Sequence, residues 1–387
     1  MRRYAFIAIF ALAVLSLLSV AHFYLVQRLV IDPAIPTPLQ VYLVLFICAA
    51  GSTIVFAPLG ERLLPRPVAQ VIAWPSSLWM GLTFYLLILL LLSDLTWTLL
   101  GATTSDPAQF VAAARGRAVG VTLLALTIGG IGLRAVLRGP VVKRLELGLR
   151  RWPRELNGFR IVQLSDIHIS TTVGRRFAQS LVDRVNELRP DLIVVTGDLV
   201  DGDVERVGPE VAPFADLRAP HGVFFVTGNH DYYSGADAWV RRVEELGLRP
   251  LRNQRVVIGS NGASFDLAGV EDYHAHLISR HRRSDVAEAV RDREGDRALV
   301  LLAHDPATFP AAVRHGVDLQ LSGHTHGGQI WPFKYFVRLA TPYVAGHYRD
   351  GDSQLYVSRG TGFWGPPMRF LAPAEITEIH LHTDSAE

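Results

Sequence analysis

The sequence predicts an α-helical transmembrane domain followed by an α/β domain, and three observations carry this prediction. The first third of the 387 residues holds long stretches without Asp, Glu, Lys or Arg, although 19% of the chain is charged. From Pro140 onward, short apolar runs alternate with segments of helical periodicity, which is typical of a layered α/β domain. Several of these apolar runs end in a cluster of polar residues. We therefore place a transmembrane domain at 1–139 and a second domain at 140–387.

The transmembrane domain is predicted to contain four helices. A helix of about 20 apolar residues crosses the ~30 Å hydrocarbon core of a bilayer. Runs of this length predict helices near 4–26, 39–59, 70–93 and 118–137. The last run is the weakest, because Arg134 lies within it and three glycines lower its helix propensity. If this run did not span, the second domain would lie on the other side of the membrane.

Basic residues predict how the chain is oriented. Arg2 and Arg3 could mark a secretory signal, but the apolar run behind them is longer than the ~7–15 residues of a signal sequence. With four spans, ten Lys and Arg residues flank the helices on the amino-terminal side and three on the other side. The positive-inside rule then places both ends, and the second domain, in the cytoplasm. The expected location is an inner or plasma membrane, crossed several times.

Composition limits the partners and the chemistry. The 38 basic and 36 acidic residues give a net charge of +2, so no broad basic field favours nucleic acid as a partner. The expected partners are the lipid bilayer and a phosphorylated substrate, and the oligomeric state is left open. The one cysteine, Cys48, lies inside an apolar run, so a metal site must use His, Asp, Asn or Glu.

Five polar clusters follow apolar runs that we predict to be strands. In chain order they are Asp166-x-His168, Gly197-Asp198, Gly228-Asn229-His230-Asp231, His304 and Gly323-His324-Thr325-His326. Each cluster alone is more often a turn or a helix cap than a site. Five such clusters behind buried strands would gather at one rim of the domain, where α/β folds bind their ligands.

This set of ligands indicates two-metal hydrolysis. Two divalent ions about 3.5–4 Å apart hold the attacking and leaving oxygens of a displacement at phosphorus and lower the pKa of bound water. Mixed imidazole and carboxylate ligation suits Mn²⁺, Fe or Zn²⁺ better than Mg²⁺. We therefore predict a metal-dependent hydrolase of phosphoric esters with two divalent metal ions as cofactors.

Taken together, the clusters resemble the motif set of the calcineurin-like metallophosphoesterases. The resemblance spans about 160–329. The runs at 161–168 and 321–329 are similar to a membrane-anchored branch, which includes YkuE-type enzymes and transmembrane proteins with a metallophosphoesterase domain. The resemblance implies a four-layer α/β sandwich. It also implies that a hydroxide between the metals attacks phosphorus without a covalent enzyme intermediate.

The resemblance implies a role for each residue of the clusters. The first metal would be held by Asp166, His168 and His326. The second metal would be held by Asn229, His304 and His324. Asp198 would bridge the two ions. His230 would be the catalytic histidine, which stabilises the transition state or protonates the leaving oxygen, and Asp231 would orient it.

Residues outside the clusters bear on the substrate. Aromatic side chains are dense near the carboxyl end, at Trp331, Phe333, Tyr335, Phe336, Phe363 and Trp364. They indicate either a lip that admits an acyl or prenyl chain, or the back of the core. Four arginines could bind phosphate or could be solvated surface residues: Arg175, Arg176, Arg359 and Arg369.

Three functions remain open at this point. The favoured one is hydrolysis of a phosphoester or pyrophosphate bond in a lipid-linked or phospholipid-type substrate. The alternative is a tethered phosphodiesterase or phosphatase for soluble nucleotides or phosphoproteins. The third is a non-catalytic membrane sensor, against which the intact His230 speaks.

Overall fold

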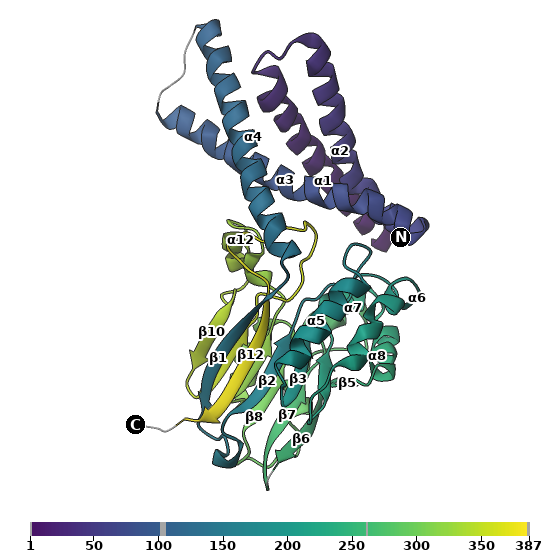
Figure 1. Cartoon of the computed structure of the whole chain (residues 1–387), viewed down its shortest axis with the longest axis vertical. Coiled ribbons are helices and arrows are strands. Elements are labelled where there is room, and N and C mark those ends of the chain that lie inside the picture. The colour runs from purple at the N-terminus through teal and green to yellow at the C-terminus, as the bar shows by residue number, and fades with distance from the viewer. Residues whose placement is uncertain (1, 101–105, 261, 385–387) are drawn as a thin grey trace. The chain divides into compact units, whose positions relative to one another are not determined.

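The protein is described by a computed structural model that covers residues 2–100, 106–260 and 262–384 (Figure 1). The chain forms two compact units. The helical unit contains the chain up to Arg134 together with the short segment Gly365–Met368. The α/β unit contains Ala135–Trp364 and the chain from Arg369 onward.

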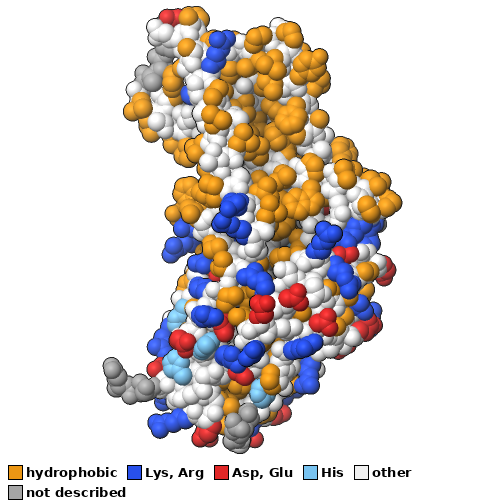
Figure 2. All heavy atoms as spheres, in the orientation of Figure 1, with side chains coloured by type: hydrophobic (Ala, Val, Ile, Leu, Met, Phe, Trp, Pro, Cys, Tyr) orange, Lys and Arg blue, Asp and Glu red, His pale blue; other side chains and the backbone are white. Residues whose placement is uncertain are grey.

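The helical unit is built from four long helices, as predicted from the uncharged runs. They are α1 (Arg2–Val26), α2 (Thr37–Leu63), α3 (Arg66–Leu99) and α4 (Pro107–Leu137), and a π-helical turn (Gln27–Ile31) continues α1. Among the described residues these four helices, with that turn, are long and apolar enough to cross a membrane. Figure 2 shows hydrophobic side chains gathered over the helices, whereas charges of both signs are interspersed over the α/β unit. The chain is therefore a membrane protein.

Several polar side chains inside the helical unit have hydrogen-bond or ion-pair partners. His22 accepts a hydrogen bond from Trp79 Nε1 at 3.0 Å, and its Nδ1 lies 2.8 Å from the carbonyl oxygen of Leu18. Asp94 is bound by Tyr24, Arg28 and Arg117. These pairings meet the hydrogen-bonding needs of groups for which lipid offers no partner.

The α/β unit contains two six-stranded sheets. The first sheet has the order β1 (Val141–Leu149), β12 (Glu375–Thr383), β2 (Phe159–Leu164), β3 (Leu192–Thr196), β4 (Val223–Val226) and β5 (Arg249–Pro250). The second has the order β10 (Gly346–Asp350), β11 (Ser353–Val357), β9 (Leu319–Ser322), β8 (Leu299–Leu302), β7 (Ala263–Gly269) and β6 (Gln254–Ser260). Strands β2 to β5 are parallel, as are β7, β8, β9 and β11. In the first sheet β12 pairs parallel with β1 and antiparallel with β2, and in the second sheet the edge pairs β10·β11 and β6·β7 are antiparallel.

Helices cover the outer faces of both sheets, which gives the predicted four-layer sandwich. Successive residues of β2 alternate between two cores: Ile161 packs between the sheets, and Val162 packs toward the helices. The helices on the first sheet are α5 (Arg175–Glu187) and α8 (Ala236–Glu245). The short helices α10 (Val286–Ala289) and α11 (Phe309–Arg314) share a third core with the second sheet. Because the inner strands are buried on both faces, their sequences are continuous apolar runs.

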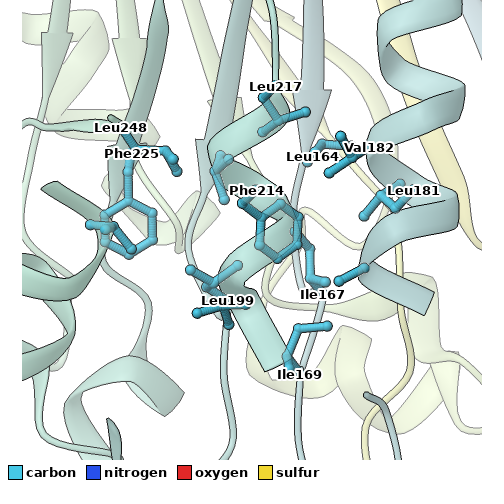
Figure 3. Packing of buried hydrophobic residues seen from close by; sticks show 14 of the residues in the cluster. Leu164, Ile167, Ile169, Leu181, Val182, Leu199, Phe214, Leu217, Phe225 and Leu248 are labelled. Atoms are coloured by element: carbon cyan, nitrogen blue, oxygen red, sulfur yellow. The ribbon is translucent and has the colours of Figure 1, made fainter. Parts of the chain in front are cut away.

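We predict that Phe214→Ala destabilises the α/β unit. Phe214 is 1% exposed and packs among Leu164, Ile167 and Leu199 in the core below α5 (Figure 3). The cavity left by the ring should lower the free energy of unfolding by about 3–5 kcal/mol. Urea unfolding of the full-length protein in detergent, followed by near-ultraviolet circular dichroism, measures the change.

Phe336→Ala serves as the matched control, because Phe336 is 56% exposed. Its effect should stay within about 0.5 kcal/mol. Equal unfolding midpoints for the two variants would contradict the packing described for Phe214.

Candidate metal centre

The predicted ligands lie on the loops that follow five parallel strands. Strands β2, β3 and β4 of the first sheet, and β8 and β9 of the second, each run directly into one of the polar clusters. Several cluster residues adopt a left-handed backbone conformation, with φ between 51° and 73°: Asp166, His168, Asp198, His324 and His326. Such a conformation is uncommon for residues with a Cβ and concentrates at functional sites.

Two glycines allow these loops to approach one another. A Cβ on Gly228 would overlap with the carboxylate of Asp198. A Cβ on Gly323 would overlap with Ser165 and with the carboxylate of Asp166. The glycine of each motif is therefore needed for close approach between loops from different strands.

The ligand atoms form two groups that meet at Asp198. In the first group, Asp166, His168 and His326 each offer one atom within 4.8 Å of the others. In the second group, Asp198, His304 and His324 do the same. Asp198 Oδ2 is 3.2 Å from His304 Nε2 and 3.8 Å from His168 Nε2, so one carboxylate faces both groups.

Unpaired atoms at the site fit a cation. Asn229 is 7% exposed, and its Oδ1 has no hydrogen-bond partner among the described residues. A buried acceptor without a partner is costly unless a cation or water satisfies it. The Nε2 atoms of His168 and His326 face each other at 3.1 Å, where two neutral rings can share only one proton. The residues present thus suit divalent metal ions with nitrogen and oxygen ligands.

Comparisons with known proteins agree with this geometry. The family model described as calcineurin-like phosphoesterase matches residues 159–328. The YkuE metallophosphoesterase of Bacillus subtilis is 33% identical over 265 residues, which cover 65% of this chain and 90% of that protein. The chain belongs to the calcineurin-like metallophosphoesterase family.

Two other relatives match a smaller share of their own length. A metallophosphoesterase of Helicobacter pylori strain J99 is 37% identical over 250 residues, which cover 63% of this chain and 65% of that protein. A Bos taurus transmembrane protein with metallophosphoesterase domain is 36% identical over 298 residues, which cover 70% of this chain and 67% of that protein. The chain thus spans about two thirds of the length of these relatives.

Carboxylates determine the charge of the metallophosphoesterase site. Burial alone would lower the pKa of His168, but the ionised Asp201, Asp198 and Asp166 raise it to about 9. Burial also lowers the pKa of His304, but nearby carboxylates, above all that of Asp198, outweigh burial and raise this pKa well above its ordinary value. The same carboxylates thus favour a positive charge at both rings, whether it comes from a proton or from a metal ion. Cations that bind there displace protons, so metal affinity rises with pH.

Asp201 orients His230, the histidine that the sequence predicts to be catalytic. Its Oδ1 is 2.6 Å from His230 Nδ1, and its Oδ2 is 3.0 Å from His168 Nδ1. One carboxylate therefore aligns two imidazole rings and fixes which nitrogen of each faces the site. Sequence reasoning missed this residue, although its signal was a second carboxylate three positions after Asp198 in the same turn.

The prediction that Asp231 orients His230 is wrong. The Asp231 carboxylate accepts hydrogen bonds from the backbone N–H groups of Asp198, Leu199, Val200 and Gly228. Burial raises its pKa to about 7, and the neighbouring Asp198 carboxylate adds to the rise, while the backbone N–H groups oppose it. Asp231 therefore holds the loop that carries Asp198 instead of contacting the His230 ring.

Aromatic side chains border the site. The rings of Tyr233 and Trp364 lie 5.3 and 5.5 Å from the ring of His230, and both side chains are more than half exposed. Among the six aromatic residues singled out in the sequence, Phe363 is buried in the core below α5. The other five are exposed by 38–56%. Of these six aromatic residues, only Phe363 is part of the hydrophobic core.

The arginines proposed as phosphate ligands differ in their surroundings. Arg369 is 2% exposed and donates to several backbone carbonyls and to His326 Nδ1, so it braces the loops. Arg359 pairs with Glu375 at 3.2 Å. Arg175 and Arg176 are exposed surface residues at the start of α5.

We predict that Asp201→Asn impairs hydrolysis. An amide cannot hold both imidazole rings in the required orientation, so kcat for an aryl phosphodiester with Mn²⁺ should fall by about 10- to 100-fold. Steady-state kinetics measures the fall, and metal analysis shows how much of it reflects lost metal.

Asp203→Asn is the matched control for this substitution. Asp203 lies two residues further on, is exposed, and caps the helix Val204–Val207 by accepting from Arg206 N. Turnover of this variant should change less than about twofold, since an Asn caps a helix about as well as an Asp. Equal losses in the two variants would contradict the role of Asp201.

Proposed function

We propose that this membrane protein is a dinuclear-metal phosphoesterase that hydrolyses a phosphoester or pyrophosphate bond in a lipid-linked or phospholipid-type substrate. The observation that carries the proposal is the pair of ligand groups joined at Asp198, beside an exposed apolar surface in a chain with four membrane-length helices. The ligand groups support the type of reaction, and the apolar surface and the helices support the type of substrate.

The ligands proposed for two divalent ions come from both groups. They are Asp166, His168, Asp198, Asn229, His304, His324 and His326. When bound, the ions supply a water molecule of lowered pKa as the nucleophile and neutralise the charge of the phosphate. Mn²⁺, Fe and Zn²⁺ match these nitrogen and oxygen ligands.

His230 is proposed to act on the leaving group. Its Nδ1 is held by Asp201 at 2.6 Å, which leaves Nε2 to bind a phosphate oxygen or to give a proton to the leaving oxygen. The side chain is 18% exposed, so a substrate can reach it. This ordered pair of residues speaks against a sensor that binds a phosphorylated ligand without turning it over.

An exposed apolar surface of the α/β unit supports a lipid substrate. We call this surface the apolar rim; it consists of Trp331, Phe333, Tyr335, Phe336, Leu339, Trp364 and Leu371. Each of these side chains is exposed by 38–87%, and five of them lie in or just before the helix α12 (Lys334–Ala340). A cluster of this kind on a domain surface marks a binding site for a protein, a membrane or an apolar ligand.

Hydrogen bonds join the two chain segments that carry the rim. Gln329 Nε2 donates to the carbonyl oxygen of Trp364 at 2.8 Å, and Gln329 Oε1 accepts from Trp364 N at 2.9 Å. Trp331 N donates to Phe370 O at 3.0 Å. Because Trp364 also contacts His230, apolar surface continues up to the catalytic ring. An acyl or prenyl chain fits such a surface better than the sugar or base of a soluble nucleotide.

Turnover of matched substrates tests the proposal. Full-length protein in detergent with Mn²⁺ is given a lipid-linked phosphodiester and its short-chain soluble analogue, with His230→Ala as the blank. We expect kcat/KM to favour the long-chain substrate by at least about tenfold, because apolar surface on the enzyme buries part of its chain.

The other outcomes identify the alternatives. Equal kcat/KM for both substrates would leave the helices as an anchor and favour a tethered enzyme for nucleotides or phosphoproteins. Bound Mn²⁺ without turnover of either substrate would favour the sensor.

The proposal includes an orientation in the membrane. Four spans with basic residues concentrated on the amino-terminal side support an orientation with both ends, and the active site, in the cytoplasm. Chains fused after residue 387 to green fluorescent protein or to alkaline phosphatase report the side. We expect bright fluorescence and little phosphatase activity in bacteria, and the reverse pattern would overturn the orientation.

A further inference from the structure

We propose that a groove among α2, α3 and α4 binds the hydrocarbon chain of the substrate; this inference rests on the function proposed above. The groove lies within the helical unit and has a volume of about 550 Å³. Its walls include Phe46, Leu78, Leu82, Leu126, Gly130 and Met368. The volume falls within the 300–1,000 Å³ that is usual for ligand pockets.

The polar atoms of the groove are already paired. Thr53 Oγ1 donates to Ala50 O at 2.6 Å, and Trp79 Nε1 donates to His22 at 3.0 Å. The other lining side chains are apolar or are glycine. An occupant therefore finds contact surface but few hydrogen bonds, which suits an acyl or prenyl chain and disfavours a sugar, a nucleotide or a peptide.

Small residues keep the groove open on the side of α4. Gly129 and Gly130 both line it, and a Cβ on Gly130 would meet nothing within 4 Å. Gly130 adds no side chain to this space, whereas a larger residue would occupy it in place of the ligand.

Met368 connects the groove to the catalytic residues through the chain. The segment Gly365–Met368 packs with the helices, and a Cβ on Gly81 of α3 would overlap with Pro366 and Met368. The residue before this segment, Trp364, contacts the His230 ring. Met368, in the wall of the groove, is thus only four residues away from Trp364 along the chain.

A second groove of the helical unit lacks this connection. Its volume is about 520 Å³, and the residues that line it all fall between Leu15 and Phe56. Bulk lipid can fill either groove. Only for the groove at Met368 does the chain itself tie a wall residue to the active site, and this difference points to the substrate's chain as its occupant.

Substituting Gly130→Phe in the full-length protein tests the inference. The ring fills the groove, and a Cβ at this position clashes with nothing. We expect kcat/KM for the long-chain substrate to fall by at least about tenfold, because each methylene excluded from an apolar site costs a several-fold factor. Turnover of the short-chain analogue should be unchanged, which also shows that the variant is folded.

Gly120→Phe is the matched control. Gly120 lies in the same helix, a Cβ there also meets nothing within 4 Å, and Gly120 does not line the groove. Both activities of this variant should equal those of the wild type. Gly130→Leu, which adds less volume, should lose less long-chain turnover than Gly130→Phe.

The results separate the two proposals. A wild type that prefers the long-chain substrate while Gly130→Phe keeps that preference would overturn the groove alone. A wild type without the preference would overturn the lipid substrate and the groove together. Equal losses of long-chain and short-chain turnover in both Gly130 variants would also overturn the groove.

Discussion

One buried carboxylate, that of Asp231, holds the loop on which the metal centre depends. Four backbone N–H groups, those of Asp198, Leu199, Val200 and Gly228, donate to its two oxygens. These hydrogen bonds keep the strained turn after β3 against the turn after β4. The side chain of Asp198 is thereby presented between the two ligand groups. Without this carboxylate, four buried N–H donors would lack partners. The turn after β3 and the turn after β4 would then separate, and Asp198 would no longer lie between the two ligand groups.

The site concentrates negative charge where water is excluded, and this explains much of its chemistry. Asp166 and Asp198 are 0% and 2% exposed, and Asp201 shares its two oxygens between two histidines. Buried carboxylates are stable only beside counter-charges. Divalent cations provide that counter-charge, and they compete with protons for the same imidazole nitrogens. The same residues therefore favour metal binding and couple it to the release of protons.

The parallel strands could be predicted because strands that are buried on both faces have continuous apolar sequences. The metal ligands could be predicted because they directly follow those apolar runs. β1 lies at the edge of its sheet. The position of β12 between β1 and β2 was not predictable, since no local pattern specifies a partner so far along the chain. The choice between Asp201 and Asp231 as partner of His230 was equally hidden. Both aspartates lie in polar turns. Only the folded backbone shows that the Asp231 carboxylate faces backbone N–H groups and that the Asp201 carboxylate faces the His230 ring.

β12 is synthesised long after β1 and β2, the two strands between which it lies. β1 and β2 leave the ribosome roughly 200 residues before Glu375–Thr383, a delay of about 10–40 s at 5–20 residues per second. During that interval both strands present unsatisfied edges, while the four helices before them are already available for insertion into the bilayer. The nascent domain therefore waits beside the membrane with an open sheet. Until its last strand arrives, that sheet offers an edge with which other chains can pair.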